Sequence, residues 1–169
     1  IGRDYPELAN QLQVTFTGEL PVMYRQLVQG NGLNGLVKEA GFLPQDEFLR
    51  LLRGADLLLT INYDGFHTLV PGKMYEYWAV GHAPILLLDG PGAAQDLLQK
   101  HDLGLCVPSD DVDRITEAIV TIFQQRQAGR PLQITTAGIE QYDRRALTGQ
   151  LAALLDELRQ AQAGSRQDA

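Results

Sequence analysis

The sequence has a single cysteine, Cys106, and only 14 lysine and arginine residues against 21 aspartate and glutamate residues. One cysteine excludes an internal disulfide framework and a cysteine-rich zinc site. The net charge of -7 argues against a nucleic-acid-binding protein, because such proteins hold phosphates with lysine and arginine. No apolar run approaches the ~20 residues of a membrane-spanning helix, and no signal peptide is visible. The three histidines lack metal-ligand spacing, so we expect no protein metal site.

What remains is an ordinary globular composition, with 44% hydrophobic and 21% charged residues over 169 positions. That length is enough for one domain with a proper core. We place this domain at residues 1–162 and expect a disordered tail at 163–169. Cys106 is expected to be a buried small hydrophobe, which fits a reducing, cytoplasmic compartment. The chain starts at Ile1 rather than Met, with no obvious first strand ahead of it, so we expect a domain excised from a longer protein.

Apolar segments alternate with helical patterns along the chain. Strands are predicted at 12–16, 36–40, 55–61, 84–88 and 103–107. Helices are predicted at 22–28, 46–53, 73–80, 93–100, 109–127, 134–140 and 144–162, the fifth starting from Ser109 as N-cap residue among several aspartates. The alternation predicts a parallel sheet with right-handed crossovers. The segment 55–61 is apolar almost throughout, which is typical of a strand buried on both faces.

The stretch after segment 55–61 has the features of a ligand site. Pro71 and Gly72 open a helix whose free backbone N–H groups favour an anion such as a phosphate. Glu76 lies one turn further on, close enough to accept hydrogen bonds from hydroxyls attached to that anion. Ligands of parallel sheets sit at the carboxyl ends of the strands. We therefore expect the loops there to converge on one crevice, and they are 18–21, 41–44, 62–72 and 89–92.

Four motifs resemble those of the C-terminal, donor-binding half of retaining GT-B glycosyltransferases, the family that includes sucrose and glycogen synthases. The specific one is Val70-Pro-Gly-Lys-Met-Tyr-Glu-Tyr-Trp-Ala-Val-Gly-His-Ala-Pro84, which is similar to the family's P-x-K-x-x-E-Y-x-A-x-G-x-P block. The others are weaker alone and lie at 41–56, 90–108 and 142–151. The resemblance covers about 12–158. It implies a Rossmann-like sheet with helices on both faces, lacking its first strand and followed by C-terminal helices.

The resemblance also implies donor-binding roles for particular residues. Glu76 matches the second carboxylate of the family's Glu-x7-Glu motif, which holds the ribose hydroxyls of a nucleotide sugar. Thr68 stands where the family has the first carboxylate, so the sugar specificity stays open. The backbone N–H groups of Gly72, Lys73 and Met74 would face the diphosphate, and the Lys73 ammonium could add a charge. Further donor-binding residues by the same likeness are Phe42, Leu43 and Pro44 beside the base, and Gly18, Val70 and Pro71.

By that resemblance the chain is the half of a hexosyltransferase that binds a donor such as a UDP- or GDP-hexose, with no other cofactor. The acceptor, a glycan or a lipid-linked molecule, would be bound by an N-terminal domain that is missing, which could also touch a membrane peripherally. The isolated domain should not turn over, and no residue is assigned a certain catalytic role. Two alternatives stay open: a non-catalytic nucleotide-binding module, and half of a GT-B-type nucleotide-sugar epimerase. Glu76 and Lys73 also remain open to the simpler reading of solvated surface residues.

Overall fold

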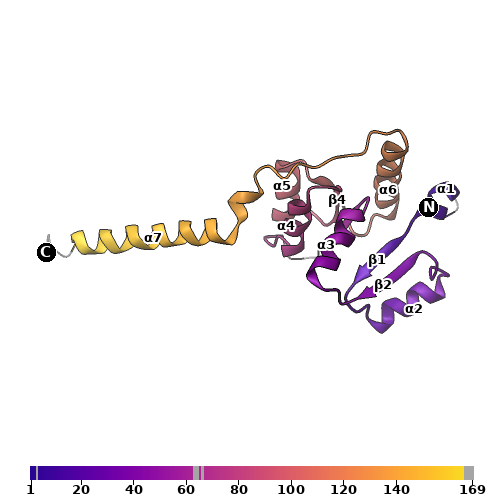
Figure 1. Cartoon of the computed structure of the whole chain (residues 1–169), viewed down its shortest axis with the longest axis horizontal. Helices are drawn as coiled ribbons and strands as arrows, with labels where there is room; N and C mark the ends of the chain where they lie inside the picture. The colour runs from indigo at the N-terminus through magenta and orange to yellow at the C-terminus, as the bar shows by residue number, and fades with distance from the viewer. Residues whose placement is uncertain (3, 63–64, 66, 166–169) are drawn as a thin grey trace.

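The computed structural model describes residues 1–2, 4–62, 65 and 67–165 (Figure 1). Its elements alternate much as predicted, and a long final helix projects away from the body. In chain order they are α1 (Pro6–Gln11), β1 (Val14–Thr17), α2 (Val22–Gly30), β2 (Val37–Gly41), α3 (Gln45–Gly54), β3 (Leu58–Ile61), α4 (Gly72–Val80), β4 (Ile85–Leu88), α5 (Ala93–Lys100), β5 (Gly104–Val107), α6 (Val112–Gln127), the 3-10 helix η1 (Ile139–Tyr142) and α7 (Arg144–Ser165).

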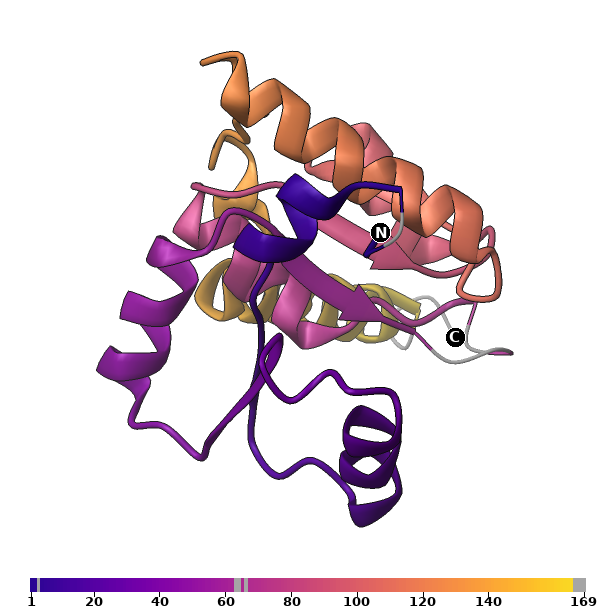
Figure 2. The same ribbon diagram turned by 90° about the vertical axis from the view of Figure 1, so that its right-hand side faces the viewer.

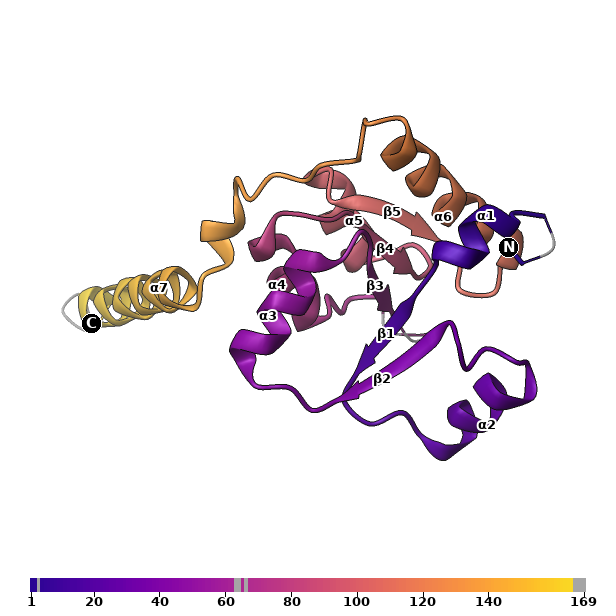
Figure 3. The same cartoon turned by 45° about the vertical axis from the view of Figure 1, so that its right-hand side comes forward.

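The strands are parallel, as predicted, but in the described part of the chain they form two sheets rather than one. β1 pairs with β2, and β3, β4 and β5 form a second sheet in that order. In Figure 3 the arrowheads of β1 and β2 point to the lower left, whereas the arrowhead of β5 points to the right. The prediction of one continuous sheet is therefore wrong for this structure, because the β1–β2 pair has its own direction.

The core lies around β4, the central strand of the larger sheet, whose four residues are all buried. Ile85 and Leu87 face one side, where they pack in a cluster with Met74 and Trp78 of α4 and with residues of α5. Leu86 and Leu88 pack on the other side with Ala118 of α6. Helices therefore cover both faces of this sheet, as the sequence predicts for parallel strands. Figure 2 shows α6 lying across one of these faces.

Helix boundaries agree with the local signals, with one correction. α4 ends at Gly81, which adopts the left-handed conformation with φ 60°. The predicted N-cap residue of α6, Ser109, is wrong: α6 is capped by Asp111, whose carboxylate accepts a hydrogen bond from the backbone N–H of Arg114 at 3.0 Å. The cap therefore lies two residues later, at a side chain that can carry a negative charge near the helix N-terminus.

Three other predictions differ from the structure. β3 is not buried throughout: among the strands that the structure describes it has a neighbour on one side only, and Ile61 is 50% exposed. The predicted helix at 134–140 is instead an extended segment followed by η1, because Ile134 is drawn into the core and the Trp78 indole donates to the Thr135 carbonyl at 2.8 Å. Cys106 is only half-buried.

The ends of the chain also differ from expectation. The sequence patterns do not predict α1, whose Leu8 is buried. At the other end, α7 continues to Ser165, so that 163–165 belongs to a helix instead of a tail. The remainder of the predicted tail, 166–169, lies outside the described residues.

Candidate functional site

The N-terminus of α4 leaves backbone donors free at the carboxyl end of β3. Pro71 precedes the helix and offers no side-chain cap. The N–H of Met74 donates to the Pro71 carbonyl at 2.9 Å, so it is already used. In the part of the chain that the structure describes, no acceptor meets the N–H groups of Gly72 and Lys73. Two free donors at a helix N-terminus can receive an anion.

α4 presents its polar residues on the face opposite the core. Met74 and Trp78, one turn apart, are fully buried. Lys73 and Glu76 are both exposed, and three-residue spacing puts them on one side of the helix, with the exposed Gly72 at its start. Among the described residues, neither the Lys73 ammonium nor the Glu76 carboxylate is held in an ion pair. One face therefore combines free N–H groups, a cation and a carboxylate.

The segment that leads to this helix end is fixed to the turn after β4. The Asn62 side-chain amide donates to the Asp89 carboxylate at 2.8 Å, and both residues are buried. The backbone N–H of Ala93, the first residue of α5, donates to the His67 carbonyl at 2.7 Å. Beyond His67, Thr68 is exposed, while Val70 and Pro71 are half-buried.

A second group of predicted residues meets at the carboxyl ends of β1 and β2. The backbone N–H of Gly18 donates to the Gly41 carbonyl at 2.7 Å. A Cβ placed on Gly18 would lie 4.0 Å from Cε1 of Phe42, so these two predicted residues are neighbours. Phe42 is 83% exposed, Leu43 is half-buried, and Pro44 precedes α3 from an exposed position. An exposed aromatic ring next to a glycine is a surface on which a planar group could stack.

These two groups belong to different sheets. Gly18, Phe42, Leu43 and Pro44 follow β1 and β2, whereas the residues of α4 follow β3. Because the strands of the two sheets run in different directions (Figure 3), their carboxyl ends do not meet at one edge. The single crevice predicted from topology is therefore not formed by one sheet edge here.

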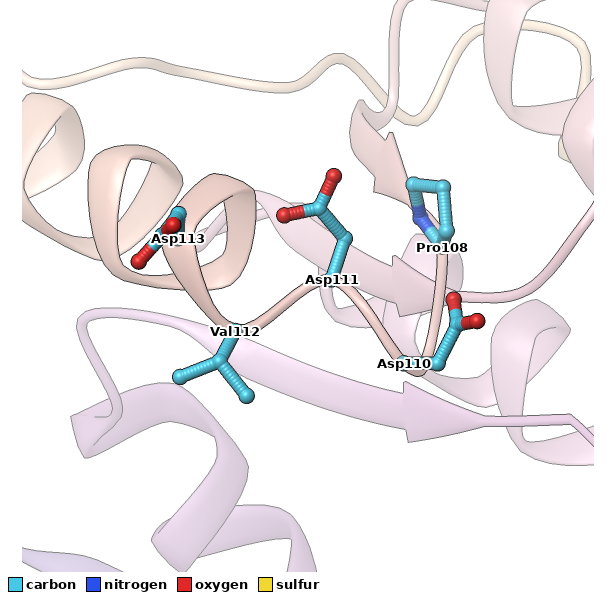
Figure 4. Close-up of a pocket in the computed structure, with 5 residues that line it drawn as sticks. All are labelled: Pro108, Asp110, Asp111, Val112 and Asp113. Atoms are coloured by element: carbon cyan, nitrogen blue, oxygen red, sulfur yellow. The ribbon is translucent and has the colours of Figure 1, made fainter.

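A shallow hollow of about 490 Å³ lies where β5 passes into α6, and none of the predicted donor residues lines it. Its walls are Pro108, Asp110, Asp111, Val112 and Asp113 (Figure 4). The three carboxylates point in different directions in this view. Asp111 is engaged as the cap of α6. Consistent with this, the described residues include no group of three or more histidine, cysteine, aspartate or glutamate side chains that could hold a metal ion.

Asn62 and Asp89 lie in loops that the sequence predicts at the crevice, but the contact between them was not predicted. Both directly follow apolar strands, and a polar residue at that place in a parallel sheet is a usable signal. Nearby, burial raises the pKa of the Cys106 thiol, and the charge of Asp89 raises it further. Burial likewise raises the pKa of the Tyr77 hydroxyl, and so does its neighbour Glu76. Both groups are therefore held in their neutral forms.

No protein-family model matches the chain, and no curated protein matches it. Among the described residues, no helix combines the length and the apolar character needed to cross a bilayer.

Proposed function

We propose that this chain binds a nucleoside diphosphate, as the donor-binding part of a hexosyltransferase that uses a nucleotide sugar. The diphosphate would lie at the N-terminus of α4, with the N–H groups of Gly72 and Lys73 toward its oxygens. The Glu76 carboxylate, one turn further, would accept hydrogen bonds from the ribose hydroxyls. Phe42 would supply the apolar surface for the base. This role requires the β1–β2 pair to come beside α4 in the bound state.

The observation that carries this proposal is the polar face of α4. Its N-terminus has no side-chain cap, and both charged side chains on the face lack ion-pair partners among the described residues. If only one of these two charged side chains were present, it could be explained as an ordinary solvated surface residue. The combination of free donors, a lysine and a carboxylate at the carboxyl end of a parallel strand is what a phosphate with attached hydroxyls requires.

A second candidate is a nucleotide-binding module without transfer chemistry. Thr68 favours it, because an exposed threonine occupies the position of the carboxylate that the resembling family places near the donor sugar. A longer protein containing this chain that binds nucleotide sugars, but neither hydrolyses them nor transfers the sugar, would support the second candidate.

Calorimetric titration with UDP, GDP, ADP and inorganic pyrophosphate tests the site. Glu76→Ala should lower the affinity for the preferred nucleotide about tenfold, because it removes a charged hydrogen-bond acceptor. The same variant should leave pyrophosphate binding unchanged, since pyrophosphate has no ribose. Lys73→Ala should lower the affinity for both the nucleotide and pyrophosphate. Glu117→Ala, which removes a carboxylate of α6, is the matched control.

The pattern across the four ligands decides the outcome. If the Glu76 and Glu117 variants lose nucleotide affinity equally, Glu76 does not bind the ribose. The loss would then come from the change in overall charge. Absence of binding for all four ligands in the unaltered chain would contradict the proposed site.

A further inference from the structure

The turn between β4 and α5 holds the segment that ends in the free helix N-terminus. Asp89 is 8% exposed, and its carboxylate uses both oxygens: Oδ2 accepts from the Asn62 amide at 2.8 Å, and Oδ1 accepts from the Gly90 N–H at 2.7 Å. Asn62 is the residue directly after β3. One buried side chain therefore joins the start of this segment to the turn after β4.

A second connection lies five residues further along. The His67 carbonyl accepts from the N–H of Ala93 at 2.7 Å. A Cβ placed on Gly92 would lie 2.5 Å from that same carbonyl oxygen and 3.0 Å from the His67 Cα. The backbone of Gly92 is extended, with φ 166°, so a side chain is excluded here by space and not by the dihedral angle. His67 can approach α5 this closely only because residue 92 is a glycine.

We propose that Asp89 and Gly92 are positioning residues for the anion site at α4. Asp89 fixes the segment where it leaves β3, and Gly92 fixes it at His67, five residues before Gly72. Together they set where the N–H groups of Gly72 and Lys73 point. Neither residue has to touch the ligand. The proposal deepens the proposed function and rests on it for the identity of the ligand.

The chain offers a matched control for each residue. Gly92→Ala forces the His67 backbone to move, whereas a Cβ on Gly90 meets nothing within 4 Å, so Gly90→Ala is the control. Asp89→Asn leaves one acceptor oxygen for two donors, whereas Asp96→Asn alters another acidic residue, in the first turn of α5. Nitrogen-15 NMR on the ligand-free proteins would record the amide shifts and order parameters of Gly72 and Lys73. Calorimetry would record the affinity for UDP.

Positioning predicts a local effect. Gly92→Ala and Asp89→Asn should shift the amide signals of Gly72 and Lys73 and lower their order parameters. Both variants should also lower the affinity for UDP about tenfold. The signals of Leu86 in the core should stay in place, and both controls should resemble the unaltered chain. Unchanged Gly72 and Lys73 signals, or equal disturbance at Leu86, would overturn the proposal. If these signals respond as expected although the unaltered chain binds no UDP, GDP or ADP, the positioning role stands and the proposed function fails.

Discussion

Gly81 shows how one position can require glycine for two reasons. It ends α4 with φ 60°, a left-handed conformation that other residues adopt at a cost. A Cβ at this position would also collide with Cγ2 of Thr136, in the extended segment that leads to η1. A side chain here would therefore strain the end of α4 and push away the extended segment that covers the core.

Replacing Gly81 with alanine should lower the free energy of unfolding by about 2 kcal/mol, as backbone strain and overpacking add. Urea unfolding followed by circular dichroism measures the change. Gly54→Ala is the control, since Gly54 lies in α3 and a methyl group added there would meet nothing within 4 Å, and it should stabilise the chain slightly. A Gly81 variant as stable as the unaltered chain would show that the extended segment moves aside without cost.

At the scale of elements, one charged contact connects α2 to β2. Arg25 donates to both carboxylate oxygens of Glu39, at 2.8 Å and 2.7 Å, and the Leu20 N–H donates to the same group at 2.8 Å. These interactions, the hydrogen bond from Arg25 first, lower the pKa of Glu39 from 4.5 to about 2. α2 itself buries none of its residues, so this contact is a main attachment of the helix.

The lowered pKa of Glu39 sets the sign of a pH effect. The stabilising contribution is fully present above about pH 4.5 and is lost as the pH falls toward 2, because the folded state binds the proton less readily than the unfolded chain. A carbon-13 NMR titration of the Glu39 carboxyl should give the low pKa. In Arg25→Gln the pKa should return toward its ordinary value, while Arg50→Gln, from the exposed pair with Asp46, should leave it unchanged. An ordinary pKa for Glu39 in the unaltered chain would contradict the bidentate contact.

α7 is an element whose apolar face is open to solvent. Its five leucines recur at helical spacing and are each about half exposed, namely Leu147, Leu151, Leu154, Leu155 and Leu158. The helix projects from the body in Figure 1, so these side chains add little to the core.

Changing Leu151 and Leu155 together to glutamine should leave the free energy of unfolding of the body within about 0.5 kcal/mol of its original value. Leu98→Ala, at a buried position of α5, should cost about 2–5 kcal/mol in the same urea titration. A large loss in the double variant that grows with protein concentration would mean that a second copy of the chain covers α7.

At the scale of the whole molecule, the two sheets should differ in local stability. A two-stranded sheet is marginal by itself, and β1 has no buried residue, whereas β4 is buried throughout. Native-state hydrogen exchange should therefore show faster opening at Phe16 than at Leu86. Exchange of both amides through one common unfolding event would show instead that the chain opens as a single cooperative unit.

The sequence predicted local features better than long-range ones. The bounds of α5 and the end of α4 at Gly81 follow from signals within a few residues, such as a turn, an apolar repeat and a glycine. The free N–H groups at Gly72 could be predicted for the same reason. The pairing of the strands could not be predicted, because a pattern of apolar residues does not show which strand edges pair with each other. The contact between Asn62 and Asp89, 27 residues apart, belongs to that second kind.

The sole tryptophan has a consequence for spectroscopy. Trp78 is fully buried against His101, at the end of α5, and the segment before η1, so the indole emission of the chain should be that of a dry, rigid environment. A change in this emission will report the opening of the part of the chain that contains β3, β4 and β5. It will not report changes in β1, α2 or β2. A fluorescence melt can therefore look like one clean transition while the β1–β2 pair and its helix have already come apart.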